Sequence, residues 1–150
     1  MSDNSKIFII NGPNLNLLGS REQEMYGNQT LAKTEVQCKK HAAEAGYRLD
    51  FRQTNSEGQL IGWIHDLSGI GAIIINPAGY THTSIAIRDA LTSCDCPVIE
   101  VHISNIFKRE VFRRKSLISD IAAGTICGFG TFGYILALNA ADDLLRNGKF

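Results

Sequence analysis

Short runs of consecutive apolar residues most restrict how this chain can fold. Ile-Phe-Ile-Ile at residues 7–10 and Ala-Ile-Ile-Ile at 72–75 are two such runs, and Val-Ile-Glu-Val at 98–101 is apolar apart from one glutamate. A strand with one wet face alternates apolar and polar residues, whereas a strand buried on both faces reads as a continuous apolar run. The runs therefore predict central strands of a parallel sheet that is covered on both sides.

The stretches between these runs have the lengths and start signals of helices. Thr30, Ser56 and either Thr83 or Ser84 are candidate N-caps, and Gln59 completes a candidate capping box with Ser56. Helices are expected over residues 30–46, 56–63, 83–93 and 131–145, and two further strands over residues 47–53 and 125–127.

Five strands that alternate with helices predict an α/β fold with a doubly wound parallel sheet. Right-handed crossovers favour the flavodoxin-like strand order 2-1-3-4-5, with helices on both faces. A length of 150 residues suggests a single domain. Residues 1–5 and 147–150 are expected to be frayed ends.

Charge and composition narrow the partners. Fifteen basic residues balance fifteen acidic ones, which argues against bulk capture of nucleic acid or of an anionic membrane. The polar start and the absence of an apolar run near ~20 residues predict a cytoplasmic protein with reduced cysteines. Cys94 and Cys96 would be only half of a zinc site, so no metal is expected.

Polar residues lie at or shortly beyond the ends of three predicted strands. Asn14 comes shortly after the first strand, Asn76 and His82 follow the third, and His102 follows the fourth. In open parallel sheets, ligands bind beyond the carboxyl ends of the strands. The sequence therefore predicts that these side chains meet at one edge of the sheet and form a binding site.

The loop after the first strand carries Arg21 and Tyr26 between Gly19 and Gly27, so this segment is a candidate lid. A free tyrosine has a pKa of ~10 and is a poor base at neutral pH. A nearby guanidinium favours the phenolate and lowers that pKa. A tyrosine base activated by arginine is one interpretation; a packing anchor beside a solvated charge is the other.

His102 has a side chain suited to proton transfer, although a buried, hydrogen-bonded histidine is the simpler reading. Glu100 lies two residues earlier, on the same face of the strand, and could orient the ring. Ile103 and Ser104 offer backbone N–H groups and a hydroxyl, which suit a carboxylate. Five cations within residues 108–115 are a solvated face, a nucleic-acid contact, or the source of one arginine that holds a substrate anion.

Residues 128–133 match the pattern Gly-x-Gly-x-x-Gly after a strand and before a helix. The pattern follows the last predicted strand, however, so no later strand can supply the acidic residue that holds a ribose. Close packing of the helix on the sheet is the favoured reading, and no nucleotide cofactor is expected.

Taken together, these motifs resemble the type II 3-dehydroquinate dehydratases. The likeness rests on residues 11–22 (Asn-Gly-Pro-Asn-Leu-Asn-Leu-Leu-Gly-Ser-Arg-Glu), 26–27 (Tyr-Gly), 76–84 (Asn-Pro-Ala-Gly-Tyr-Thr-His-Thr-Ser), 100–105 (Glu-Val-His-Ile-Ser-Asn) and 112–114 (Phe-Arg-Arg). It spans residue 7 to about residue 145. Gln23 departs from the proline of many members but removes no chemical group.

The resemblance implies a lyase that removes water from 3-dehydroquinate without a cofactor and gives 3-dehydroshikimate through an enolate. It implies that Tyr26 is the base, His102 the acid, Arg21 the activator of Tyr26, and Asn14 the holder of a water. The implied role of this reaction is in the shikimate pathway of aromatic amino acid biosynthesis, or alternatively in quinate breakdown.

The resemblance also implies the substrate contacts and a homo-oligomer, a dodecamer built as a tetramer of trimers. The residues that it places on substrate are Asn76, His82 and Arg113 for hydroxyls, Ile103 and Ser104 for the carboxylate, and Asp89 from a neighbouring subunit.

Three alternative functions have less support in the sequence. A lysine imine could give the same product, but none of the seven lysines reads as a buried residue at a strand end. A flavin- or nucleotide-binding module on the same fold lacks a phosphate loop. An RNA-binding module would have to rely on the basic segment alone.

Overall fold

A computed structural model of the chain describes residues 5–20 and 28–148. Within these residues, five strands form one parallel sheet in the order β2-β1-β3-β4-β5, which confirms the predicted topology. The strands are β1 (Lys6–Asn11), β2 (Arg48–Gln53), β3 (Ala72–Asn76), β4 (Val98–His102) and β5 (Gly124–Cys127).

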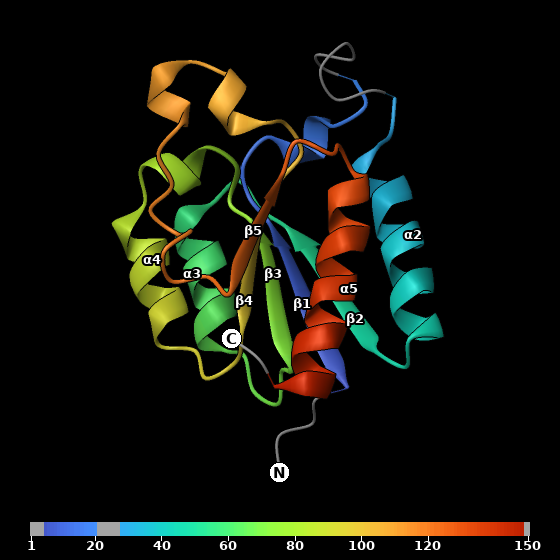
Figure 1. Cartoon of the computed structure of the whole chain (residues 1–150). Helices are drawn as coiled ribbons and strands as arrows, with labels where there is room; N and C mark the ends of the chain where they lie inside the picture. Colours follow the sequence, from blue (N-terminus) through green and yellow to red (C-terminus); the bar gives the residue numbers. More distant parts are fainter. Residues whose placement is uncertain (1–4, 21–27, 149–150) are drawn as a thin grey trace.

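Helices cover both faces of the sheet (Figure 1). α2 (Leu31–Glu44) and α5 (Phe132–Asn147) pack on one face, while α3 (Glu57–His65) and α4 (Ile85–Thr92) pack on the other. The central strands supply both cores, because successive side chains of a strand point to opposite faces. Ile7 and Ile9 belong to the first core, and Phe8 and Ile10 belong to the second.

Side-chain caps fix where three helices begin. The hydroxyls of Thr30, Ser56 and Ser84 accept hydrogen bonds from the backbone N–H three residues later, so Ser84 and not Thr83 begins α4. The capping box of α3 is only half formed. Ser56 caps Gln59 N, but the Gln59 side chain accepts a hydrogen bond from Thr54 instead of reaching back to Ser56.

Several boundaries differ from the sequence prediction. β2 begins at Arg48 and β5 at Gly124, each displaced by one residue. α5 runs two residues further than expected, so Asn147 is helical and its side-chain amide bonds Asp143.

Among residues 5–20 and 28–148, four 3₁₀ helices of three to five residues were not predicted: η1 (Leu15–Leu17), η2 (Ala78–His82), η3 (Ile106–Lys108) and η4 (Val111–Arg113). η1 follows β1, η2 follows β3, and η3 and η4 lie between β4 and β5. In Figure 1 they gather at the upper end of the sheet. Segments this short show no apolar periodicity, which is why the sequence does not indicate them.

The carboxyl ends of β1 and β3 are joined closely at Gly12. Its N–H donates to Asn76 O over 2.8 Å. A Cβ at this position would lie 2.5 Å from Pro77 O, which is a clash with backbone. Glycine is therefore required where the first loop leaves β1 beside β3.

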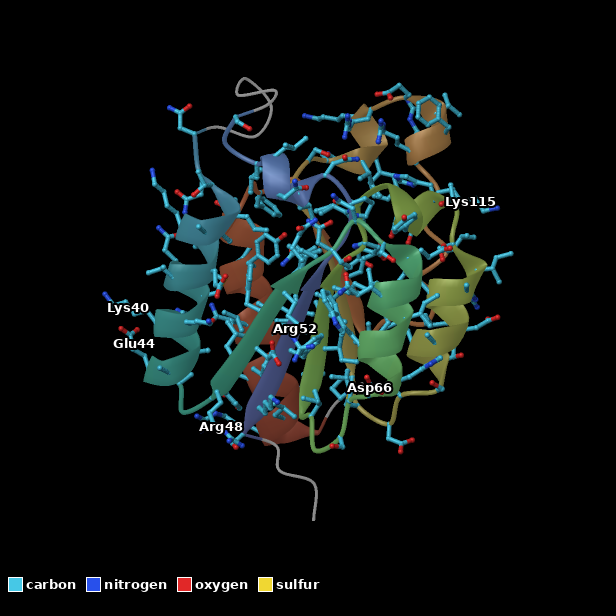
Figure 2. All side chains as sticks on the ribbon, turned by 180° about the vertical axis from the view of Figure 1, so that it is seen from behind. Lys40, Glu44, Arg48, Arg52, Asp66 and Lys115 are labelled. Atoms are coloured by element: carbon cyan, nitrogen blue, oxygen red, sulfur yellow. The ribbon has the colours of Figure 1, made fainter. Side chains whose placement is uncertain are left out.

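An arginine on β2, Arg52, lies against aromatic rings of the second core. The Arg52 guanidinium on β2 lies 5.1 Å from the ring centre of Phe8 and 5.4 Å from that of Trp63, and Figure 2 labels it near the middle of the sheet. It also pairs with Asp50 at 2.9 Å. The arginine thus covers the second core near the edge strand.

No helix within the described residues combines the length and apolarity that crossing a bilayer requires.

Candidate active site

A hollow of about 280 Å³ lies beyond the carboxyl ends of β1, β3 and β4. Its polar lining consists of Asn14, Asn76, His82, His102, Ser104, Arg109 and Arg113. Its apolar lining includes Leu15, Leu17, Leu18, Ile103 and Ile106. The sequence prediction that two histidines and two asparagines meet at this edge is confirmed.

His102 ends β4 and is held by Glu100 from the same strand face. The ring Nε2 lies 2.5 Å from the Glu100 carboxylate. His102 is 5% exposed and Glu100 is fully buried. An ionised carboxylate only accepts hydrogen bonds, so Nε2 carries a hydrogen and Nδ1 is left to exchange a proton with a ligand. His102 is therefore both a buried histidine and a wall of the hollow.

The Glu100 carboxylate is surrounded by donors. Thr81 Oγ1 donates over 2.6 Å, Ser116 Oγ lies 2.8 and 3.0 Å from the two oxygens, and Thr125 Oγ1 lies 3.5 Å away. Burial would raise the pKa of Glu100, but the hydrogen bonds from His102, Thr81 and Ser116 outweigh it and hold that pKa below its usual value. Glu100 consequently stays ionised and keeps the His102 ring in one orientation.

His82, in η2, is oriented by the backbone. Its Nδ1 lies 2.6 Å from the carbonyl oxygen of Lys115, a residue that Figure 2 labels at the end of the sheet that bears η3 and η4. Because a carbonyl only accepts, Nδ1 carries a hydrogen and Nε2 is the ring nitrogen left for a ligand. In the tautomer whose single hydrogen is on Nδ1, His82 can accept a hydrogen bond from a ligand hydroxyl.

One short segment holds both histidine systems. Lys115 O anchors His82, the next residue, Ser116, donates to Glu100, and Leu117 N donates to Thr81 O over 2.8 Å. Residues 115–117, which follow η4, are therefore hydrogen-bonded to η2 and to Glu100. They fix the imidazole rings of His82 and His102 relative to each other.

Asn14 stands in the left-handed region, with φ of 70°. Its N–H donates to Asn55 Oδ1 over 3.0 Å, and Gln53 Nε2 bonds the same oxygen and the Gly12 carbonyl. These contacts tie the first loop to the end of β2. The Asn14 side chain makes no capping bond to η1, and this residue lines the hollow.

Two arginines, Arg109 and Arg113, line the hollow. Arg113 donates from Nε to Glu110 over 2.8 Å, and Arg109 Nη1 lies 3.5 Å from Ser104 Oγ. Ile103 and Ser104 both line the hollow. The reading of residues 108–115 as a solvated face is therefore wrong for Arg109 and Arg113, which turn toward the site.

Other candidates are not brought to the hollow or cannot be placed. Asp89 is exposed on α4 and does not belong to the lining found among the described residues. Arg21 and Tyr26 lie outside the described residues. Within residues 5–20 and 28–148, no group of three or more His, Cys, Asp or Glu side chains is arranged to hold a metal ion.

The glycine pattern serves packing at its last position. A Cβ on Gly133 would lie at ordinary contact distance from Val101 and Ile126, 3.5 and 3.7 Å away. α5 thus begins closely against β4 and β5. Gly128, with φ of +97°, takes a backbone conformation that favours glycine.

The sequence did not point to Ser116 or Tyr134. Asn11 and Arg109 were indicated only as members of a polar strand end and of the basic segment. Ser116 is 16 residues from Glu100, and Tyr134 is 123 residues from Asn11, to which it donates a hydrogen bond. Among the donors to Glu100, Thr81 is the one that the sequence could indicate, because it is adjacent to the candidate site residue His82.

Known proteins resemble this chain over most of its length. The family model described as "Dehydroquinase class II" matches residues 5–142. The chain is 53% identical over 133 residues to "3-dehydroquinate dehydratase 2" of Pseudomonas aeruginosa, which covers 88% of this chain and 90% of that protein. It is 51% identical over 147 residues to "3-dehydroquinate dehydratase" of Rhizobium meliloti, which covers 97% and 99%.

Solved structures give the same result. The type II dehydroquinase from Propionibacterium acnes superposes with a TM-score of 0.87 at 43% identity, over 92% of this chain and 96% of that one. The type II dehydroquinase from Butyrivibrio crossotus gives a TM-score of 0.89 at 41% identity, over 91% and 97%.

Proposed function

The chain belongs to the class II dehydroquinase family, and on that premise we propose that it dehydrates 3-dehydroquinate by a stepwise anti elimination at the hollow beyond β1, β3 and β4. Tyr26 is the base, and Arg21 favours its phenolate form. His102 is the acid, and the product is 3-dehydroshikimate. The membership supports the overall reaction; the roles of the individual residues are the proposal.

The elimination proceeds in two proton transfers. The Tyr26 phenolate removes a proton from the carbon next to the ketone, and the electron pair moves to the carbonyl oxygen as an enolate. A water held by Asn14 donates a hydrogen bond to this oxygen where charge develops. The enolate then expels the hydroxyl group, which His102 protonates to water. A positioned acid or base typically contributes ~10²–10⁴-fold.

The observation that carries the acid assignment is the His102–Glu100 pair. A buried, ionised Glu100 fixes a hydrogen on Nε2, so Nδ1 is the ring nitrogen that this pair leaves for a proton transfer, and His102 lines the hollow. An imidazole that alternates between neutral and protonated forms suits a general acid near neutral pH. The proposed contacts of Asn76, His82 and Arg113 with hydroxyls, and of Ile103 and Ser104 with the carboxylate, are supported by their place around the same hollow.

We extend the proposal to the assembly. Phe107 on η3, Phe112 on η4, and Phe129 and Phe132 at the start of α5 are each exposed by more than half. All four lie at the end of the sheet that bears the hollow. Exposed apolar side chains gathered at one end favour association with another chain. We propose a dodecamer built as a tetramer of trimers, in which the exposed Asp89 reaches a neighbour's site.

The proposed setting is the cytoplasm, and the proposed role is aromatic amino acid biosynthesis through the shikimate pathway. Quinate breakdown is the alternative role for the same reaction. Four free cysteines support a reducing compartment. The nucleic-acid reading has less support, because Arg109 and Arg113 of the basic segment face the hollow.

The test is the appearance of enone ultraviolet absorbance when the purified protein meets 3-dehydroquinate. His102→Ala and Tyr26→Phe should each lower kcat by about 10²-fold or more. His65→Ala and Tyr47→Phe are matched controls, because His65 is exposed at the carboxyl end of α3 and Tyr47, between α2 and β2, donates to Asp142 on α5. Both controls should keep near-normal turnover.

Two results would remove the proposal or part of it. An unchanged rate in Tyr26→Phe would end the base assignment. Covalent trapping of substrate by borohydride would favour a lysine imine, against which stands the finding that the lining given by the described residues holds no lysine.

A further inference from the structure

Three polar side chains are buried directly beneath the hollow. Asn11 ends β1, Asn76 ends β3, and Tyr134 lies in the first turn of α5. Asn11 and Tyr134 are fully buried, and Asn76 is 2% exposed. Asn11 and Asn76 are partners in the sheet register. The group therefore connects two strand ends with the helix that covers them.

The hydrogen bonds of this group run in one direction. Tyr134 gives its only hydrogen to Asn11 Oδ1 over 2.6 Å. The same hydroxyl oxygen can then only accept, and it accepts from Asn76 Nδ2 over 2.9 Å. The phenol is thus both an acceptor for one amide and a donor to the other.

Two backbone groups at the ends fix this direction. Asn11 Nδ2 donates to the carbonyl of Arg52 over 3.1 Å, which turns Asn11 Oδ1 toward the phenol. Asn76 Oδ1 accepts from the N–H of Ala78 over 3.1 Å, which turns Asn76 Nδ2 toward the phenol. A carbonyl only accepts and an N–H only donates, so neither amide can flip without losing bonds at both of its ends.

The consequence for the hollow is a defined pattern at Asn76. A side-chain amide has two N–H donors and two lone pairs on oxygen. Tyr134 takes one donor and Ala78 takes one lone pair. One donor and one lone pair of Asn76 are left for a ligand, in places that the buried group determines.

We propose that Tyr134 is a positioning residue for substrate binding, which acts through Asn76 and sets the direction in which that amide presents its remaining donor to a substrate hydroxyl. Asn11 supports it by accepting the phenol hydrogen. The inference rests on the proposed function, because it takes Asn76 to be a substrate contact.

A purely structural role explains less. The Tyr134 ring packs near Phe51, with ring centres 6.2 Å apart, and a phenylalanine would fill that space equally well. A buried hydroxyl is costly unless it is bonded, so its presence is explained by what it bonds. Burial raises the pKa of Tyr134, which keeps the phenol neutral and its single hydrogen in place.

The experiment is a double-mutant cycle on kcat and KM with 3-dehydroquinate. Tyr134→Phe in the otherwise unchanged chain should lower kcat/KM roughly fivefold to tenfold, mainly through KM, as expected for one misdirected neutral hydrogen bond. In the Asn76→Ala background the same change should cost less than about twofold, because the residue through which it acts is gone. Tyr47→Phe, which removes another bonded tyrosine hydroxyl away from the hollow, should leave both constants unchanged.

Thermal unfolding of each variant separates folding from binding. If Tyr134→Phe folds too weakly to assay, Asn11→Ala is the second variant. It keeps the phenol and should raise KM about twofold to threefold, again only while Asn76 is present. Equal losses in both backgrounds, or a lowered melting temperature with unchanged KM, would overturn the inference. A wild-type protein that gives no enone absorbance would overturn the proposed function as well, so the two failures are distinguishable.

Discussion

Glu100 is a fully buried carboxylic acid, a position in which acidic side chains are rare. A carboxylate with no exposed surface is unfavourable unless donors surround it. Here one imidazole and the hydroxyls of Thr81 and Ser116 lie within 3.0 Å of its oxygens. The folded chain therefore prefers the ionised form, and its pKa lies below the ordinary value of 4.5.

This preference gives a stability prediction with a defined sign. The unfolded chain binds a proton at Glu100 at a higher pH than the folded chain, so the stabilisation is complete above pH 4.5 and is lost as pH falls toward the folded pKa. Glu100→Gln should lower the free energy of unfolding by about 2 kcal/mol at pH 7, the order expected for lost bonds to a charged group. The gap between the two proteins should narrow below pH 4.5.

Urea unfolding of both proteins at pH 7 and at pH 4 measures this gap. Glu44→Gln is the control, because Glu44 is exposed near the end of α2 (Figure 2). It should change stability by no more than about 0.5 kcal/mol at either pH. A gap for Glu100→Gln that widens in acid would mean that the buried carboxyl is protonated in the folded protein.

At the scale of elements, Gly12 decides how β1 enters the site. We expect Gly12→Ala to destabilise the fold by several kcal/mol and to lower activity, because its Cβ would meet the Pro77 backbone at 2.5 Å. Gly62→Ala is the matched control. Gly62 lies inside α3, and a Cβ there meets nothing within 4 Å. It should raise stability by about 0.5–1 kcal/mol, the helix preference of alanine over glycine.

Thermal and urea unfolding of the two alanine variants test this contrast directly. A Gly12→Ala protein as stable as the wild type would show that the first loop can move away from β3 without cost. The site would then not depend on that contact.

The elements also show what a sequence can and cannot predict. The apolar runs at 7–10 and 72–75 identified two central strands, because complete burial on both faces leaves a direct mark on composition. Thr30 was readable as a cap, and Ser84 as one of two neighbouring candidates, because a cap is a local interaction. η2 and η4 were not, although they carry His82 and Arg113, because one turn of 3₁₀ helix has no periodicity to read.

For the molecule as a whole, the parallel topology explains why the site residues were partly predictable. Parallel strands end at one edge, so Asn76 and His102 could be expected to meet from their positions alone. What holds them could not be expected. Ser116 reaches Glu100, and Tyr134 reaches Asn11, only after the chain has folded, and neither pairing leaves a spacing in the sequence.

In the proposed assembly, Asp89 of one subunit serves the site of its neighbour. His102→Ala and Asp89→Ala should each be at least tenfold less active, since each removes a group from the proposed site. Unfolding and refolding the two together should restore activity, because a mixed site combines His102 of one chain with Asp89 of its neighbour. Random pairing gives about a quarter of sites with both groups intact.

Mixing His102→Ala with Tyr26→Phe is the matched control, because both residues are proposed to act within one chain and no mixed site regains both. Native mass spectrometry of the refolded samples, with one of the two variants isotopically labelled, shows whether mixed oligomers have formed. Recovery in the first mixture alone supports a site shared between subunits. Equal recovery in both mixtures, or none in either despite mixed oligomers, would place Asp89 outside the neighbour's site and leave its exposure on α4 as an ordinary solvated charge.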